Sequence, residues 1–352
     1  MSQPDPPSEP SPPNPSPNEA VGNEMRPGQS VAPNPAPPSA RRFDWRINVA
    51  LFFLTVLSVF YAGQFWGNEK PNPDAGLQLL SGWHFAVPLL SILLAHEFGH
   101  YIAARLHRVP TSLPYFLPLP AQLSPFGTFG AVIIMPERIK TRRALMDIGA
   151  AGPLAGLLVA IPVMLHGLSL STVEPKTQGS YIQEGQSILY WLLKYAVHGS
   201  IPAGHDVFLH PTALAAWVGF LVTFLNLLPV GQLDGGHVAY ALFGERQNAW
   251  GKKLALVPWL LVLYNVARYV MPILARGNEF GFNSLTSEDW NPVSAAMPWV
   301  VSALLLSLLG RLSGRGHPPV EDTELGPGRR LVGWVTLGLF VLLFMPTPMV
   351  FY

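Results

Sequence analysis

The sequence predicts an all-α polytopic membrane protein, and its composition leads to that fold class. Charged residues make up 12% of the 352 residues, about half of the roughly 25% found in soluble domains. Hydrophobic residues reach 49%, and the mean hydropathy is +0.28. A chain of this length would suggest about two soluble domains, but so few charges could not cover their surfaces.

Charge and cysteine content exclude several classes of protein. The 22 Lys and Arg residues nearly balance the 21 Asp and Glu residues, so the chain offers no basic field for nucleic acid and we expect no nucleic-acid partner. The chain contains no cysteine, which excludes disulfides, cysteine nucleophiles and thiolate metal sites. Any metal ion must therefore be held by His, Asp, Glu or Asn side chains.

Long apolar runs predict about seven transmembrane helices, after a Pro-rich N-terminal tail, residues 1–40, that we expect to be disordered. A helix needs about 20 mostly apolar residues to cross a bilayer. The candidate spans are 47–66, 83–105, 144–168, 211–230, 254–275, 294–310 and 331–350. The stretch 181–199 is a candidate interfacial helix.

The distribution of Lys and Arg predicts how the spans cross the membrane. Basic loops precede the first span and follow the second, fourth and sixth, whereas the loops between them are poor in basic residues. This pattern places the N-terminus in the cytoplasm and requires an odd number of spans. We therefore expect an integral, multi-pass protein in the lipid bilayer of a prokaryotic cell membrane. The sequence leaves the oligomeric state open.

The segment His96-Glu97-Phe98-Gly99-His100 places ionisable side chains inside the second span. Such residues are costly in lipid, so each is a functional hypothesis. His96 and His100 share one helix face, about 6 Å apart along the axis. Two imidazoles at that spacing can hold one Zn²⁺, with Glu97 beside them to accept a proton from a zinc-bound water. The alternative is a histidine pair satisfied by helix packing.

A metal site would need a third protein ligand, and Asp234 is the best candidate. Pro229 and three glycines interrupt the helix around it at membrane depth. Irregular backbone at that depth is tolerated only where protein or water satisfies its polar groups. Two alternatives stay open: Asp234 caps a helix, or His237 is the ligand, although we expect His237 to face outwards.

These two motifs resemble those of the site-2 proteases, intramembrane zinc metalloproteases that cut transmembrane substrates. That family pairs H-E-x-x-H on one helix with N-x-x-P-x-x-x-L-D-G on a later one. Both patterns occur here in order, as His96, Glu97 and His100 and then as Asn226, Pro229, Leu233, Asp234 and Gly235. The resemblance covers roughly residues 80–245.

The resemblance implies one Zn²⁺ per chain, bound by His96, His100 and Asp234. It makes Glu97 the general base, and Asn226 the group that supports the polarised carbonyl or the tetrahedral oxyanion. It implies hydrolysis of peptide bonds in or near the transmembrane segments of membrane protein substrates, as in regulated intramembrane proteolysis.

The same resemblance divides the chain into four parts. Residues 1–40 are the tail, 41–80 the first transmembrane helix and an outer loop, 81–245 the catalytic membrane core, and 246–352 additional C-terminal transmembrane helices. The second and fourth spans both run inwards and bring their motifs to a similar depth. We therefore expect the active site toward the cytoplasmic side.

The segment 110–135 connects the second and third spans and is rich in proline at its start. We expect a bent loop that ends in a short strand. In the family, a re-entrant loop or strand here is thought to hold an unwound substrate by edge pairing. The candidate substrate-binding residues are Gly127, Thr128, Phe129 and Gly130. The alternative is a plain interfacial connector.

The third span opens with a stretch rich in small residues, 147–156. Gly152 and Gly156 form a small face that lets a neighbouring helix approach closely. We expect Asp147 to cap this helix or to support the site from outside, in preference to binding metal.

Two other functions compete with proteolysis. A metal or ion transporter would use the same buried His and Asp residues, but it predicts inverted repeats and polar groups that continue to the other face. The sequence has no evident repeat, and the upper half of the second span is apolar. A catalytically silent homologue would only bind membrane helices, and the complete set of catalytic residues argues against it.

Overall fold

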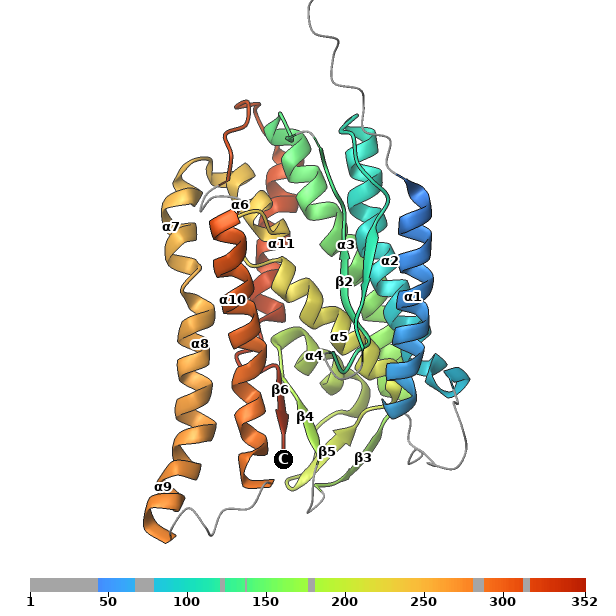
Figure 1. The fold of residues 1–352 in the computed structure, drawn as a ribbon, viewed down its shortest axis with the longest axis vertical. Coiled ribbons are helices and arrows are strands. Elements are labelled where there is room, and N and C mark those ends of the chain that lie inside the picture. The colour runs from blue at the N-terminus through green and yellow to red at the C-terminus, as the bar shows by residue number, and fades with distance from the viewer. Residues whose placement is uncertain are drawn as a thin grey trace, which may run out of the picture. The chain divides into compact units, whose positions relative to one another are not determined.

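The computed structural model describes residues 44–66, 79–120, 124–136, 138–176, 181–280, 288–312 and 317–352. The chain divides into the units Met1–Phe43 and Asp44–Tyr352. The predicted tail, 1–40, lies outside the described residues. The second unit is a bundle of long helices with a strand hairpin along one flank and short strands at one end (Figure 1).

Five helices carry or surround the predicted motifs. They are α1 (Trp45–Gly63), α2 (Trp83–Leu106), α3 (Arg142–Ser169), α5 (Pro211–Asn226) and α6 (Asp234–Phe243). Helix α3 packs against α2, α5 and α6 and so lies at the centre of this group. Helix α5 is buried on nearly every side, which explains why its sequence is apolar all round.

The remaining helical elements complete the bundle. They are α4 (Ile188–His198), α7 (Arg246–Leu254), α8 (Val257–Asn265), a π-helical segment (Val266–Val270), α9 (Met271–Phe280), α10 (Met297–Leu312) and α11 (Pro327–Leu343), with 3₁₀ turns at Gln64–Trp66, Leu79–Gly82 and Glu288–Ala296.

Capping side chains and prolines fix several helix ends. The Thr141 side chain accepts a hydrogen bond from the Ala144 N–H and so begins α3, because the first N–H groups of a helix lack intrahelical partners. Helix α11 ends at Leu343, although the apolar run predicted a span to residue 350. Pro346 and Pro348 follow, and proline disfavours helical backbone both at its own position and at the residue before it.

The chain is mostly helical, but the all-α expectation needs correction because the described residues include three strand pairs. Strand β1 (Tyr115–Pro118) pairs with β2 (Thr128–Val132), β3 (Thr172–Pro175) with β5 (His205–Phe208), and β4 (Ile182–Glu184) with β6 (Met349–Phe351), all antiparallel. The β1–β2 hairpin occupies the segment in which one short strand was expected. The other two pairs were not expected.

The candidate interfacial helix 181–199 is only partly helical. Strand β4 takes up its first part, and α4 begins at Ile188 after the Ser187 side chain caps the Tyr190 N–H. Three- and four-residue strands carry too short an alternation of apolar and polar residues to be recognised in a sequence.

The β1–β2 hairpin runs beside α1 for nearly the whole length of that helix (Figure 1). Near one end, the Asn48 side chain donates to the Leu113 carbonyl (2.7 Å). Near the other, the Trp66 indole N–H donates to the Pro125 carbonyl (2.8 Å). Asn48 and Trp66 are separated by roughly 27 Å of helix at 1.5 Å per residue. The hairpin is therefore about as long as a membrane-crossing helix.

Four helical stretches of the described residues are long and apolar enough to cross a membrane. They are Trp45–Trp66, Leu79–Leu106, Arg142–Ser169 and Arg246–Arg276. Pro211–Asn226 and Val293–Leu308 are shorter apolar helices. A multi-pass membrane protein follows from these lengths, whereas the count of seven spans is not confirmed by them.

Candidate metal centre

Helix α2 supplies three of the predicted site residues. His96, Glu97 and His100 are 3%, 6% and 9% exposed, so polar side chains are buried within an otherwise apolar helix. The two imidazole rings lie 4.9 Å apart between centroids, as expected for residues one turn apart on the same face. Burying such groups is costly unless they share a partner.

The break between α5 and α6 supplies Asp234. The helix stops at Asn226, turns through Gly231 (φ +56°), and resumes at Asp234 as the first residue of α6. A Cβ at Gly235 would overlap the Leu227 carbonyl, so this tight turn requires glycine at that position. The predicted interruption between α5 and α6 thereby directs the Asp234 carboxylate toward α2.

The donor atoms of His96, His100 and Asp234 converge on one point. The Nε2 atoms of the two histidines are 3.2 Å apart, and they lie 3.3 Å and 3.2 Å from the Asp234 Oδ2. In a tetrahedral zinc site with bonds of about 2.0–2.1 Å, neighbouring donors are roughly 3.3 Å apart. The three spacings therefore fit a single Zn²⁺ ion, and these residues form a group that can hold a metal.

The orientation of His100 is set by the backbone of α3. Its Nδ1 lies 2.7 Å from the Ile148 carbonyl, which can only accept a hydrogen bond, so Nδ1 carries the proton. The lone pair of a neutral ring is then on Nε2, the atom that faces His96 and Asp234. In metal-binding histidines, a hydrogen bond from the ring nitrogen that does not bind the metal usually fixes the tautomer.

The small residues of α3 form the wall behind the histidines. A Cβ added at Gly152 would overlap the His100 imidazole, and one added at Gly156 would lie 3.2 Å from the Cβ of His96. At Gly149 an added Cβ would lie 2.9 Å from that of His237. The predicted small face therefore lets α3 approach both α2 and α6.

Asn226 and Glu97 border the same group. The Asn226 side-chain nitrogen lies 3.3 Å from His96 Nε2. The Glu97 carboxylate interacts electrostatically with His96, His100 and Asp234. The arrangement thus joins a proton acceptor and an amide donor to a three-ligand metal site.

The family model of peptidase family M50 matches residues 84–263, about half of the chain and both motifs. The chain belongs to peptidase family M50. The resemblance to the site-2 proteases is thereby confirmed, and the zinc expected from it agrees with a family of metalloproteases and with the donor set described above.

Several plant proteins are related to this chain. Probable zinc metalloprotease EGY1 of Arabidopsis thaliana is 32% identical over 284 residues, which cover 78% of this chain and 44% of the relative. EGY1 of Oryza sativa subsp. japonica is 30% identical over 56% of this chain and 38% of its own length. EGY2 of Oryza sativa subsp. indica is 28% identical over 66% of this chain and 43% of its own length.

The chain spans less than half the length of these relatives. All three are named as chloroplastic, so they do not support the prokaryotic cell membrane expected from the sequence. No solved structure matches the chain.

The four candidate substrate-binding residues lie in the hairpin and outside the metal group. Thr128 is used within the hairpin, where its hydroxyl donates to the Leu117 carbonyl (2.9 Å) and accepts from the Gly130 N–H (3.0 Å). Gly127 packs against the backbone of α1 at Ser58. Phe129 is 52% exposed. Phe129 is thus the one residue of the four whose side chain is open to a partner.

His237 was expected to face outwards, but it faces a neighbouring segment of the protein. It is partly buried, and its Nδ1 lies 2.9 Å from Nε2 of His317. The His317 ring stacks on Tyr240 and places its own Nδ1 2.7 Å from the Pro318 carbonyl. His237 is outside the metal group of the described residues and instead ties α6 to the segment before α11.

Two arginines that join the helices around the site were not predicted as site residues. Arg142 donates to the carbonyls of Ala241 (2.5 Å) and Leu242 (3.0 Å) at the end of α6. Arg329 of α11 donates twice to Asp147 (2.9 Å and 2.8 Å). Their position in the N-terminal turns of apolar helices is a weak signal, because basic residues are common at membrane boundaries.

Asp147 does not cap α3, which begins at Arg142 after the Thr141 cap, and its partners lie outside the metal group. Its carboxylate also lies 2.8 Å from Nε2 of His107, directly after α2, and it takes no part in the metal group. One carboxylate in the first turns of α3 therefore joins α2, α3 and α11.

Proposed function

We propose that this M50 peptidase is an intramembrane zinc metalloprotease that hydrolyses peptide bonds in or near the transmembrane segments of membrane proteins. The observation that carries the proposal is the convergence of His96, His100 and Asp234 within 3.3 Å of one another on buried, apolar helices. A site of this kind has no evident use in packing, because three polar side chains at this depth need a common ligand.

Each residue of the site has a separate role in the proposed hydrolysis. When bound by His96, His100 and Asp234, zinc would supply a Lewis acid and lower the pKa of water to about 7. Glu97 accepts the proton of the attacking water on its carboxylate and passes it to the leaving amine. The Asn226 side-chain amide donates a hydrogen bond to the carbonyl oxygen as negative charge develops on it.

We propose seven membrane crossings for the chain. The four long stretches account for α1, α2, α3 and α7–α9; α5 with α6, α10 and α11 supply the other three. The four-part division at residues 1–40, 41–80, 81–245 and 246–352 follows from this assignment. The N-terminus then lies in the cytoplasm, and the metal site, about 20 Å along α2 from Trp83, lies toward that side.

The β1–β2 hairpin is proposed to re-enter the membrane beside α1 and to hold the substrate. Its length matches that of α1, and side chains of α1 and of the 3₁₀ turn that follows it, Asn48 and Trp66, donate to hairpin carbonyls at both ends, as backbone within a membrane requires. Strand β1 packs on α1, which leaves the β2 edge, with Phe129, for a substrate segment. A substrate helix must unwind before its carbonyls can be attacked, and strand pairing stabilises the extended form.

The transporter and the silent homologue are not favoured. The family is one of peptidases, and the catalytic glutamate and asparagine accompany the metal ligands. Cleavage itself is the property that separates the three functions.

A membrane-embedded reporter tests the proposal. The purified chain in liposomes, loaded with zinc, is expected to cleave the reporter within its hydrophobic segment. Glu97→Gln is expected to lower the rate at least 1,000-fold, because the proton acceptor is lost; Glu174→Gln, on the exposed strand β3, is the matched control with an unchanged rate. Equal cleavage by wild type and Glu97→Gln would end the proposal.

A further inference from the structure

The strands at the end of the bundle away from the metal site form two separate pairs. Strand β4 pairs only with β6, and β5 only with β3, among the described residues. Figure 1 shows the four in the order β6, β4, β5, β3. A cavity of about 170 Å³, here called the slot, is bordered by the consecutive residues 181–184 on one side and 206–209 on the other.

The backbone of β4 turns alternate N–H and C=O groups away from β6, on the side of the slot. Tyr181 exchanges two hydrogen bonds with Tyr352 (3.0 Å and 2.8 Å), and the Gly185 N–H donates to the Pro348 carbonyl (2.7 Å). Backbone groups of alternate residues in a strand point to opposite sides. Ile182 and Glu184 therefore direct their N–H and C=O groups away from β6.

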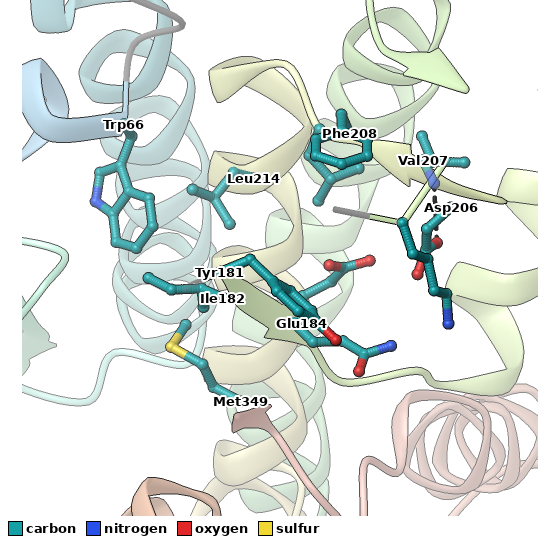
Figure 2. Close-up of a pocket in the computed structure, with 12 residues that line it drawn as sticks. Trp66, Tyr181, Ile182, Glu184, Asp206, Val207, Phe208, Leu214 and Met349 are labelled. Atoms are coloured by element: carbon teal, nitrogen blue, oxygen red, sulfur yellow. Dashed lines mark hydrogen bonds between the residues drawn. The ribbon is translucent and has the colours of Figure 1, made fainter. Parts of the chain in front are cut away.

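Strand β5 presents the opposite edge of the slot. The Val207 N–H points away from β3 and donates to the carboxylate of Asp206 (2.8 Å). Val207 is paired across β3 with Val173, and its carbonyl points to the side away from that strand. Consecutive residues of two strand edges thus line one cavity (Figure 2).

Two acidic side chains that line the slot, Glu184 and Asp206, share one buried cation, and another part of the lining is apolar. Lys194 of α4 is 4% exposed, and its Nζ lies 3.3 Å from both Glu184 Oε1 and Asp206 Oδ1, so it fixes the two strands relative to each other. Trp66, Leu214 and Met349 line the apolar part (Figure 2).

The slot adjoins the turn of the β1–β2 hairpin. Trp66 lines the slot and also donates its indole N–H to the Pro125 carbonyl. Its ring stacks on Phe126, with centroids 6.2 Å apart. A chain that runs along the hairpin edge toward this turn would arrive at the slot.

We propose that the slot binds an extended peptide of three to four residues by strand addition between β4 and β5, and that this peptide is the part of the substrate that flanks the membrane at this end of the molecule. Two facing strand edges offer main-chain donors and acceptors, which an extended chain satisfies and a lipid tail does not. The apolar walls accept one side chain of that peptide. The inference rests on the proposed function, since it names a second contact of the same substrate.

The absence of cysteine in the chain permits a clean cross-linking test. Ile182 on the slot edge is 38% exposed, and Val173 on the outer edge of β3 is 37% exposed. Each is changed to Cys in the Glu97→Gln protein, which keeps a membrane-spanning reporter intact. The reporter carries one Cys in the flank at this end. Ile182→Cys is expected to give at least fivefold more cross-linked product than Val173→Cys; equal yields, or none from either, would overturn the proposal.

Proline substitutions test whether binding of a peptide in the slot contributes to cleavage of the substrate. Ile182→Pro removes an N–H at the slot edge without breaking a β4–β6 hydrogen bond, and Val173→Pro does the same at the outer edge of β3. Two reporters are compared, one with a ten-residue flank and one cut back to the membrane boundary. Ile182→Pro is expected to raise KM about tenfold for the first reporter only, while Val173→Pro changes neither.

Each outcome of this test decides one question. If Ile182→Pro cleaves the flanked reporter with an unchanged KM, the slot does not bind substrate. If both reporters lose cleavage equally, the residue is merely structural and the proposal fails. If wild type cleaves neither reporter, the proposed protease function fails instead.

Discussion

At the residue scale, the convergence of His96, His100 and Asp234 was predictable from the sequence, and the backbone group that orients His100 was not. The spacing of His96 and His100 and the break before Asp234 predict which side chains converge, because the first follows from helix geometry and the second from glycine and proline. The carbonyl that orients His100 belongs to the backbone of Ile148. Every residue has such a carbonyl, so the sequence gives no signal that this one contacts His100. Asp147 was expected to support the site, but its partner Arg329 lies 182 residues away.

His210 gives a residue-scale prediction about pH. Its Nδ1 accepts the Thr212 N–H (3.3 Å) and caps α5. Burial, with the nearby His84 and His166, lowers the pKa of His210 below its usual 6.5. The cap needs an unprotonated Nδ1, so its contribution, about 1 kcal/mol for a helix cap, is full above pH 6.5 and is lost as the pH falls through the lowered pKa.

The test compares thermal unfolding of wild type and His210→Asn between pH 7.5 and pH 5. Asn caps a helix without titrating in this range. Wild type is expected to lose more stability on acidification than the variant does. Identical pH dependence in the two proteins would show that His210 is not the titrating cap.

At the element scale, the structure depends on how closely α3 approaches its neighbours. The small face of α3 was predictable from the spacing of Gly152 and Gly156, and the hairpin from its prolines and glycines. The strand pairs β3–β5 and β4–β6 were not predictable, because β6 lies 165 residues beyond β4 and each strand is too short to show a pattern. Their pairing is decided by tertiary packing.

Gly152 gives the prediction at this scale. A Cβ at this position would overlap the His100 ring, so Gly152→Ala is expected to displace the ligand and lower zinc affinity about 10–100-fold, as changes to the support of a metal ligand do. Gly338→Ala in α11 is the matched control, since no atom lies within 4 Å of the Cβ that it adds.

Competition with a coloured zinc chelator measures the two affinities. If Gly152→Ala binds zinc as tightly as Gly338→Ala, then α3 does not determine the position of His100.

At the scale of the whole molecule, the membrane class follows from composition, and the assembly of the C-terminal helices does not. Few charges and long apolar runs predict a multi-pass protein without any knowledge of contacts. The contact of α11 with the core includes the pair Arg329 and Asp147, which the sequence does not connect. Pro346 and Pro348 shorten the last helix and free the residues that form β6 beside β4.

Arg329 gives the prediction at this scale. Its two hydrogen bonds to Asp147 join α11 to α3, but the pair is partly exposed, with side chains 40% and 27% accessible. Solvent screening reduces such a pair to about 1 kcal/mol. Arg329→Ala is therefore expected to lower the unfolding temperature by a few degrees in detergent, and Arg329→Lys by less, because lysine keeps the charge and loses the paired geometry.

Arg330→Ala, on the exposed neighbour, controls for the loss of a basic residue. An unfolding temperature of Arg329→Ala equal to that of Arg330→Ala would show that α11 is held by apolar packing alone.

The most direct measurement is zinc K-edge X-ray absorption on the zinc-loaded protein, with the zinc content of each sample determined alongside. Wild type is expected to bind one zinc per chain with two imidazole nitrogens and carboxylate oxygen at about 2.0–2.2 Å. Asp234→Ala and His100→Ala are each expected to lose most of the zinc. Full occupancy in both variants, or a wild-type spectrum without two imidazoles, would contradict the account.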